Sequence, residues 1–358
     1  MRAVIHPGRL KTTREWRVVF VASQQVQAGS GKVTRTDVAR YAGVSTAVVS
    51  YVINGGPKPV AAATAARVRE AIKALQYQPN ATARALTMGS ARLLGMIVPD
   101  STNPYFAELT DAIAQAAAAR GYALLAANSR TDADTERHNT LNLVSRQVDA
   151  IILATVLTPS EVAAMPVHGI PRVLIDQSST VHGIPTVSTD FEQGAALGVQ
   201  HLIGHGHHDI AILVGKDIDP ARVDPRHNGW RKALREAGLP EGPAEFTDFT
   251  RQGGYEATRR LLELPKRPTG IFASSDLLAI GALRAIHEAG LAIPEDIAVV
   301  SFDGTSESEF SWPQLTTVRQ SINEIAEAAV DAALSSNGSG GKAQLLPTEL
   351  IIRQSCGC

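Results

Sequence analysis

From Leu93 onward the sequence alternates short apolar segments with amphipathic helical segments, and this alternation restricts the fold more than any other feature. LLGMIVPD, YALLAANS and AIILATV are typical of buried strands, and residues 104–120 and 132–147 between them have helical periodicity. The pattern starts again after about Asp190, with strands at IAILVG, TGIFASS and IAVVSFD. Apolar strands separated by helices predict parallel sheets covered on both faces. We therefore expect two doubly wound lobes with a ligand cleft at the carboxyl ends of their strands.

Residues 33–88 differ from this body because they contain helical patterns and no strand pattern. In VTRTDVARYAGVSTAVVSYVIN (33–54), apolar and small residues recur with helical spacing on both sides of Gly43. Ser45 is placed to cap the second helix, whose exposed face carries Ser, Thr and Ala instead of charges. Two helices joined by so tight a turn predict a DNA-binding helix-turn-helix, with an ordinary antiparallel helix pair as the alternative.

Charge is distributed unevenly along the chain, although the formal net charge is only −1. Residues 1–32 carry six Lys/Arg and one Glu, and residues 33–92 carry eight Lys/Arg against two acidic residues. The remaining 266 residues therefore have a net charge of −12. A basic N-terminal part on an acidic body favours contact with a polyanion, although a solvated basic surface would show the same composition.

The stretch DVARYAGVS…VSYVIN, followed by RVREAIKALQYQPNATARAL, closely resembles the head of lactose-repressor-type regulators, the LacI/GalR family. Residues 33–358 can be laid along that family, and residues 1–32 fall outside it. The resemblance implies an all-α helix-turn-helix head and an α/β periplasmic-binding-protein-like body of two doubly wound parallel-sheet lobes. It also implies a homodimer or tetramer that binds a near-palindromic double-stranded DNA operator.

Within the head, Thr46, Ala47 and Tyr51 are expected to face base edges, and Thr34, Ser45 and Ser50 to contact phosphates. The resemblance implies that residues 80–86 form a hinge helix that folds on DNA, with one leucine wedged into the minor groove. The family's common Thr-Val-Ser-Arg is Val-Val-Ser-Tyr here, so a guanine contact by arginine is in doubt at that position. The predicted DNA-binding residues are Thr34, Arg35, Ser45, Thr46, Ala47, Ser50, Tyr51, Asn54, Asn80, Ala83, Arg84 and Leu86.

Polar and aromatic residues follow several predicted strands of the body, where a cleft would lie. Carboxylates and amides, together with an arginine and aromatic rings, suit a polyhydroxylated or otherwise polar small molecule. Any one aspartate at a strand end could instead cap the next helix, and this alternative fits Asp276 best. In the periplasmic-binding-protein-like lobes that the body resembles, the matching positions hold the effector. The predicted effector-binding residues are Asp100, Asn103, Phe106, Asp176, Arg226, Phe249, Ser275, Asp303 and Gln320.

Other candidate sites in the sequence lack parts that their chemistry needs. The segment GSGK (29–32) lacks the glycine spacing and the Ser/Thr of a phosphate-binding loop. His201 and His205 suit the last turn of a helix, and no Cys, Asp or Glu partner for them is evident in the sequence, so we expect no metal site there. Cys356 and Cys358 are interpreted as reduced thiols, since one pair supplies too few ligands for structural zinc. No nucleophile–base arrangement or dinucleotide fingerprint occurs, so no catalytic residue and no cofactor are predicted.

These features together predict a DNA-binding transcriptional regulator, a repressor whose operator affinity is controlled by a small polar effector such as a sugar. The alternatives are a solute-binding protein of a sugar transport system and an enzyme on the same doubly wound fold. The short apolar run 18–22 is too short for a membrane span or a secretory signal, so a cytoplasmic protein is expected. The expected organisation is a poorly ordered extension (1–32), a helix-turn-helix domain (33–79), a hinge helix and linker (80–92), an N-terminal lobe (93–190 with about 322–342) and a C-terminal lobe (191–321 with about 343–358).

Overall fold

The computed structural model describes residues 33–54, 59–78, 89–167, 169–177, 180–216, 223–335 and 343–358. By its internal contacts the chain divides at residue 80 into two compact units, which are a small helical head and a larger α/β body. The expected N-terminal extension and the predicted hinge residues Asn80, Ala83, Arg84 and Leu86 lie outside the described residues. None of the helices in the described part combines the length and apolar character that a bilayer span requires.

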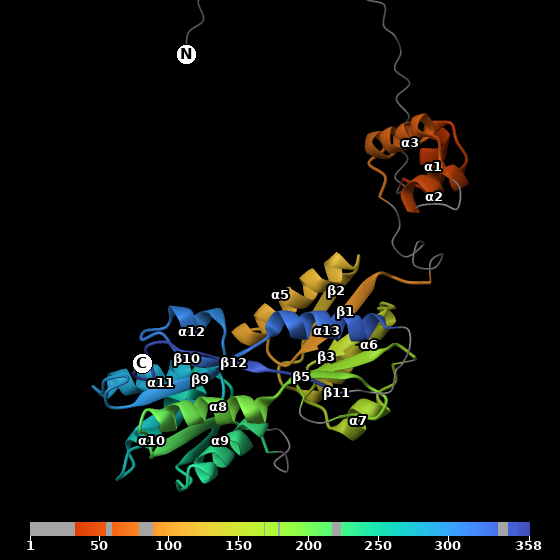
Figure 1. The fold of residues 1–358 in the computed structure, drawn as a ribbon. Coiled ribbons are helices and arrows are strands. Elements are labelled where there is room, and N and C mark those ends of the chain that lie inside the picture. The colour runs from red at the N-terminus through yellow and green to blue at the C-terminus, as the bar shows by residue number, and fades with distance from the viewer. Residues whose placement is uncertain are drawn as a thin grey trace, which may run out of the picture. The chain divides into compact units, whose positions relative to one another are not determined.

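The head consists of α1 (Arg35–Ala42), α2 (Thr46–Asn54) and α3 (Ala62–Ala74), as Figure 1 shows. Val38 on α1 and Val49 on α2 are fully buried against Val68 of α3. The expected stripe of α1, Val38 and Ala42, is buried, whereas the one expected for the second helix, Val44, Val48 and Val52, is only partly buried. Gly43 adopts the left-handed conformation (φ 63°) between α1 and α2, which glycine allows at little cost. The tight turn predicted from the sequence is therefore present.

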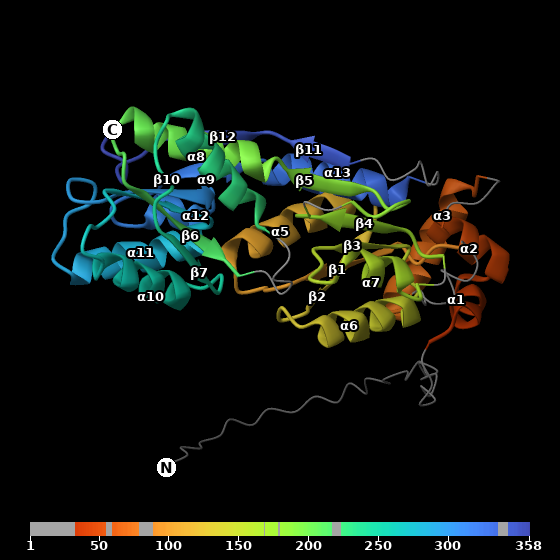
Figure 2. The ribbon, with the colours of Figure 1, turned by 90° about the horizontal axis from the view of Figure 1, so that it is seen from below.

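The first lobe of the body is built on a six-stranded parallel sheet in the order β11-β5-β4-β3-β1-β2. One face of the sheet packs against α5 and α13, and the other packs against α6 and α7 (Figure 2). Its elements are β1 (Leu93–Val98), α5 (Pro104–Ala119), β2 (Ala123–Asn128), α6 (Ala133–Ser145), β3 (Ala150–Leu153), α7 (Pro159–Ala164), β4 (Arg172–Ile175), β5 (Thr186–Thr189), α13 (Ile322–Leu334) and β11 (Ala343–Leu346).

The second lobe repeats this plan with a sheet in the order β12-β10-β9-β8-β6-β7, in which only β12 runs antiparallel to its neighbour. Helices α8 and α9 cover one face, and α10 and α11 cover the other. Its elements are α8 (Phe191–Gly204), β6 (Ile210–Gly215), α9 (Pro225–Glu236), β7 (Ala244–Thr247), α10 (Arg251–Leu262), β8 (Gly270–Ala273), α11 (Asp276–Glu288), β9 (Ala298–Asp303), α12 (Ser306–Phe310), β10 (Thr316–Gln320) and β12 (Thr348–Ile351).

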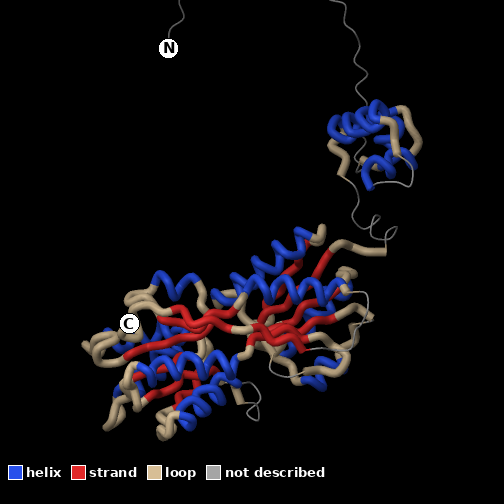
Figure 3. The backbone as a smooth tube through the Cα atoms, viewed as in Figure 1, coloured by secondary structure: helices blue, strands red, loops and turns tan. Residues whose placement is uncertain are grey.

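The chain crosses between the two sheets after β5, after β10 and after β11, so both halves of the sequence contribute to both lobes (Figure 3). The chain was predicted to return to the second lobe at about residue 343, but it returns one strand later, after β11. Residues 343–346 form β11, which pairs in parallel with β5, and Leu346 is buried in the first lobe's core. The crossing therefore comes at Pro347. Because the strands of both sheets end near these crossings, their carboxyl ends face the same cleft.

Candidate functional site

The exposed face of α2 is small and uncharged, as the sequence predicted. Thr46, Ala47 and Asn54 are exposed, and Ser50 and Tyr51 are half-buried between them. Thr46, Ser50 and Asn54 follow one another at four-residue intervals, so they lie along one side of the helix. A helix face without long charged side chains can approach another surface closely, and Tyr51 is the longest side chain on it.

Several polar groups predicted to contact phosphate also hold the ends of the head's helices. Thr34 forms a capping box with Asp37: its hydroxyl donates to the carboxylate (2.6 Å) and its backbone N–H donates to the same oxygen (2.9 Å). These hydrogen bonds from Thr34 lower the pKa of Asp37. The Ser45 hydroxyl accepts from the Val48 N–H (3.3 Å), so this serine caps α2 as predicted. Whether these side chains also contact DNA stays a prediction.

The body has a cavity of about 380 Å³ at the carboxyl ends of its strands. All nine residues predicted to bind an effector line it, and they come from both lobes. The first lobe supplies four, the second lobe another four, and Gln320 lies at the end of β10, where the chain crosses between lobes. The cavity is large enough for a single sugar ring or a molecule of similar size. Its volume and mixed polar and aromatic walls are those of a small-molecule site.

Arg226 is the central cation of this cavity and is held by one carboxylate and three aromatic rings. It forms a bidentate pair with Asp224 (3.0 and 3.1 Å), and its Nη1 donates to the Ser274 carbonyl (3.1 Å). Its guanidinium carbon lies 4.8–5.4 Å from the ring centres of Phe191, Phe249 and Phe302. Burial alone would lower the pKa of Arg226, but Asp224 and the other nearby carboxylates raise it above its usual value. The group is therefore a permanent and rigidly placed hydrogen-bond donor.

The local sequence explains how Arg226 is placed. Helix α9 begins at Pro225, and Asp224 is its N-cap. Pro225 occupies the first turn, where its missing N–H costs nothing. The Asp224 carboxylate accepts from the Arg226 N–H (2.8 Å) while it also binds the arginine side chain. One carboxylate thus fixes both the helix start and the guanidinium.

Asp176 and Asp303 add two further carboxylates beside this arginine. Burial raises the pKa of Asp176 to about 6, although Arg226 and a hydrogen bond from the Tyr105 hydroxyl (3.3 Å) oppose this effect. Burial and the Asp276 carboxylate raise the pKa of Asp303 well above its usual range, although it accepts a hydrogen bond from Gln320 (2.9 Å). With Asp224, three acidic groups surround one arginine. The cavity therefore has an excess of hydrogen-bond acceptors.

The backbone is strained at both of these aspartates. Asp176 has φ 56° and Asp303 has φ 106°, and each directly follows or ends a buried strand. Residues other than glycine rarely adopt such conformations, which cost roughly 1–3 kcal/mol and occur most often at ligand sites. Both residues line the cavity.

The cap of α11 is Ser275 and not Asp276, so the prediction for Asp276 is wrong. Ser275, predicted to bind effector, is the N-cap, and its hydroxyl accepts from the Leu278 N–H (3.3 Å). Asp276, expected to be the cap, lies in the first turn, and its carboxylate accepts from Ser301, Thr305 and Thr317 (2.6–2.9 Å). Ser275 still lines the cavity, but its hydroxyl oxygen already accepts one hydrogen bond from the helix backbone.

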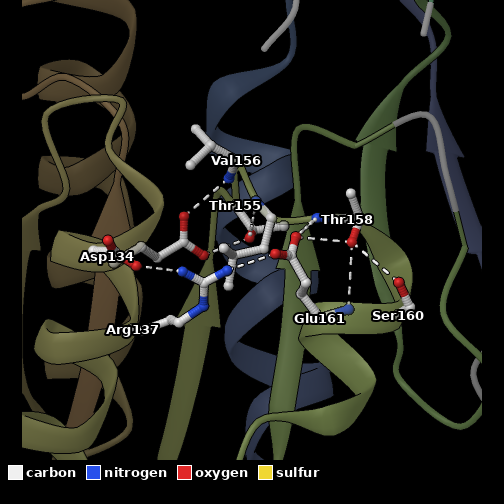
Figure 4. A network of polar contacts seen from close by, with 9 residues as sticks. Asp134, Arg137, Thr155, Val156, Thr158, Ser160 and Glu161 are labelled. Atoms are coloured by element: carbon white, nitrogen blue, oxygen red, sulfur yellow. Dashed lines mark hydrogen bonds and ion pairs between the residues drawn. The ribbon is translucent and has the colours of Figure 1, made fainter. Parts of the chain in front are cut away.

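One wall of the cavity is the loop after β3, and it is held by a buried glutamate that the sequence did not indicate. Thr155 and Val156, which line the cavity, donate to the carboxylate of Glu136 through the Thr155 hydroxyl and the Val156 N–H (2.9 Å). Beside them Arg137 bridges Asp134 and Glu161 (Figure 4). Burial raises the pKa of Glu136 even though both hydrogen bonds lower it. This network holds the loop after β3 in position.

Sequence reasoning missed several other cavity residues. Tyr105 and Phe191 lie in the first turns of α5 and α8, so the sequence gives no sign that they line a cavity. Asp224 could have been found, because Asp-Pro is a common start for a helix. Glu136 has no such signal, since a glutamate within the predicted helix 132–147 is normally exposed.

The structure also contradicts the expectation that His201 and His205 have no cysteine nearby. Cys356 and Cys358 lie against both imidazoles, and one atom from each of the four side chains falls within 4.8 Å of the others. The group is not evident from the sequence because its two halves are about 150 residues apart.

Comparisons with known proteins find relatives for both the head and the body. Residues 34–80 match the family of bacterial regulatory proteins, lacI family, and residues 199–356 match the periplasmic binding protein-like domain. The ribose operon repressor of Escherichia coli (strain K12) is 36% identical over 306 residues, which is 84% of this chain and 92% of that protein. A crystal structure of the Lac repressor dimer bound to operator and the anti-inducer ONPF has a TM-score of 0.83 and 30% identity, covering 91% of this chain and 99% of that one. A LacI family transcriptional regulator from Enterococcus faecium with bound ribose has a TM-score of 0.65 and 30% identity, covering 74% and 98%.

Proposed function

Because the chain belongs to the LacI family of bacterial regulatory proteins, we propose that it is a transcriptional repressor controlled by a neutral, sugar-like effector. The head binds an operator, and the effector binds in the cavity between the two lobes of the body. The observation that carries the effector class is the cavity itself, in which one arginine and a surplus of carboxylates face aromatic rings.

The charges of the cavity select among polar ligands. Asp224 already neutralises Arg226, so Asp176 and Asp303 leave the cavity acidic unless they hold protons. A phosphorylated or carboxylated effector would add negative charge to this site, where Arg226 is already paired with Asp224 and the other lining cation, Lys216, is exposed to solvent. A neutral polyol instead donates its hydroxyl hydrogens to the carboxylates and accepts from the guanidinium. Its apolar ring face can pack on Phe106 and Phe191.

A ribose-like aldose fits these walls and the size of the cavity. The relatives agree with this class, since one is named a ribose operon repressor and another was solved with bound ribose. Another solved relative is the transcriptional regulator CelR in complex with cellobiose, so a related protein also takes a larger sugar. We therefore propose an aldopentose as the first candidate and an aldohexose as the second.

The residues at the lobe crossings give the effector a route to the DNA-binding function. Gln320 accepts from the Thr189 hydroxyl (2.6 Å) and donates to Asp303, so it connects two crossing segments to the cavity. Between the lobes, Ser306 donates to Glu108 through its N–H (2.9 Å) and its hydroxyl (2.7 Å). A ligand that contacts both lobes favours one angle between them, and operator affinity changes by the same factor as effector affinity.

A second copy of the chain is proposed to pack on the face formed by α12 and the following turn. Phe310 and Trp312 are 86% and 87% exposed, which is unusual for large aromatic side chains unless another surface covers them. They border a groove that is also lined by Ile280 and Leu283 of α11. The Lac repressor relative is a dimer on its operator, and a dimer with two heads suits a near-palindromic site.

The proposal is tested with the untagged full-length protein and DNA fragments enriched by binding-site selection. Operator affinity is measured by fluorescence anisotropy with and without D-ribose, D-xylose, D-galactose and ribose 5-phosphate. We expect a neutral sugar to change affinity at least about fivefold, which is the usual lower limit of allosteric coupling, and the phosphate ester to have little effect. Failure to enrich any DNA would refute the repressor function. DNA binding that responds only to anionic ligands or nucleobases would refute the effector class and leave the repressor function standing.

A substitution separates the two sites. Arg226→Met should abolish the sugar response while the affinity of the ligand-free protein for its operator stays within about twofold of the wild type. Arg235→Met is the matched control, because Arg235 lies in the last turn of the same helix and is exposed. If Arg226→Met responds to the sugar as the wild type does, the effector does not bind in this cavity.

A further inference from the structure

Four potential metal ligands meet at the end of α8, on the second lobe. His201 lies in the last turn of this helix, and His205 is its C-cap. Cys356 and Cys358 belong to the last three residues of the sequence, and Figure 2 shows this end of the chain beside the end of α8. These four residues are distinct from the cavity between the lobes, since none of them lines it.

The distances among the four ligand atoms are those of a compact tetrahedral group. The Cys358 sulfur lies 3.0 Å from the Nε2 atom of His205 and 3.5 Å from that of His201. The Cys356 sulfur lies 3.3 Å from both His201 Nε2 and the Cys358 sulfur. Tetrahedral zinc, with bonds of about 2.3 Å to sulfur and about 2.0–2.1 Å to nitrogen, places neighbouring ligands roughly 3.3–3.8 Å apart. No pair in this group is more than 4.8 Å apart, so small side-chain shifts would complete the tetrahedron.

The backbone holds these ligands in place without any ion. The side chain of Cys356 is buried in the core of the second lobe, and its sulfur accepts from the Thr316 hydroxyl (3.0 Å). The preceding Ser355 donates to the Val299 carbonyl (2.6 Å) and accepts from the Thr316 N–H (2.9 Å). Gly357 has φ 91°, a conformation that glycine adopts at little cost, and the turn there brings the two sulfurs to the same side. A preorganised ligand set loses little entropy on binding, which favours high affinity.

We propose that His201, His205, Cys356 and Cys358 form a Cys2His2 site for Zn²⁺ that fastens the end of the chain to α8. Two thiolates and two neutral imidazoles satisfy the ion's preference for four nitrogen and sulfur ligands and balance its charge. All four positions are taken by the protein, which is typical of a structural zinc site. A disulfide between the two cysteines would instead need a sulfur–sulfur bond of about 2.05 Å and would leave both histidines without a role.

The exposure of the ligands makes the proposal testable without unfolding the protein. Cys358 and His205 are exposed, so Cys358→Ser and His205→Ala remove a ligand and leave the core intact. His208→Ala is the matched control, because His208 is an exposed histidine three residues from His205 and outside the group. The untagged, reduced full-length chain is stripped with a chelator, and Zn²⁺ is then titrated in competition with a chromophoric chelator.

We expect one Zn²⁺ per chain in the wild type and in His208→Ala, and at least about a tenfold loss of affinity in Cys358→Ser and His205→Ala. Co²⁺ as a probe should give the visible absorption of a tetrahedral complex and a thiolate charge-transfer band, and Cys358→Ser should weaken the latter. Zn²⁺ at 100 times the wild-type Kd should raise the Tm of the wild type by several degrees and that of Cys358→Ser by about half as much or less.

Three results would overturn the proposal. Both variants could bind Zn²⁺ as tightly as the wild type, which would show an adventitious ion only. The wild type could bind much less than one ion per chain. The two cysteines could also be joined in a disulfide in the protein purified under reducing conditions, so that no metal is taken up. None of these results would bear on the proposed repressor function, because the site is separate from the cavity and from the head.

Discussion

Replacing Asp176 by asparagine should stabilise the ligand-free protein even though it damages the proposed effector site. The pKa of this carboxyl is about 6 in the folded chain, against a usual value of 3.8, because it is buried beside Tyr105. The folded state therefore binds a proton more tightly than the unfolded state, and stability falls as the pH rises from 3.8 to 6. Above pH 6 the full cost of holding a buried carboxylate is present.

The size of the effect follows from the same shift. A difference of about two pKa units corresponds to about 3 kcal/mol at pH 7.5, and about half of that persists at pH 5. Asparagine removes the charge, can still accept the hydrogen bond from Tyr105, and tolerates the left-handed backbone (φ 56°) better than most residues. We expect the free energy of unfolding of Asp176→Asn to exceed that of the wild type by about 1–3 kcal/mol at pH 7.5.

The assay is urea unfolding at pH 7.5 and pH 5, followed by tryptophan fluorescence, to which the buried Trp230 contributes, together with circular dichroism. Asp248→Asn is the control, because Asp248 lines the same cavity but is exposed, so removing its charge should change stability by less than about 0.5 kcal/mol. The gain of Asp176→Asn should be about twice as large at pH 7.5 as at pH 5, while its sugar affinity falls. A loss of stability at pH 7.5, or an equal gain at both pH values, would refute the reasoning.

Three further outcomes follow from the structure. Tyr51→Ala should alter the operator sequence recovered by binding-site selection more than it alters non-specific affinity, and an identical consensus for both proteins would contradict the base-reading role. Arg226→Met should lower the free energy of unfolding by about 3–5 kcal/mol because it leaves the buried Asp224 carboxylate unpaired. Adding Asp224→Asn to this variant should restore more than about 1 kcal/mol, and strictly additive losses in urea unfolding would argue against an Arg226–Asp224 interaction. Phe310→Asp combined with Trp312→Asp should weaken self-association by about 2–4 kcal/mol, seen as monomers in sedimentation velocity, and an unchanged sedimentation coefficient would place the dimer face elsewhere.

The cavity could be predicted residue by residue because parallel strands impose a simple rule. Every strand of a doubly wound lobe points its carboxyl end to the same edge, so a polar residue after any of them is brought to one place. Asp176 and Asp303 are 127 positions apart in the sequence, yet the rule needs no knowledge of how their strands pair. The head could be predicted for a related reason, since its core comes from helical spacing within 40 residues.

Contacts that depend on side-chain competition were harder to predict. At the start of α11 both Ser275 and Asp276 are good capping residues, and local sequence favours neither strongly. The choice is made by Ser301, Thr305 and Thr317, whose hydroxyls and one N–H surround the aspartate and leave the serine as the cap. These partners follow Asp276 by 25–41 positions, so no local rule includes them.

The histidine–cysteine group shows where sequence reasoning about metal sites fails. A zinc site is usually recognised from two closely spaced pairs, and both pairs are present here, as His-x3-His and Cys-x-Cys. Each pair taken alone has an ordinary explanation, since imidazoles suit the last turn of a helix and a cysteine pair near the end of a chain can simply be reduced. The separation of 153 positions between His205 and Cys358 hides the match. Strand β12 brings the pairs together, because its pairing with β10 carries the following residues across the second sheet to the end of α8. Two ligand pairs that are each incomplete can therefore form one four-ligand group when the topology of the fold brings them together.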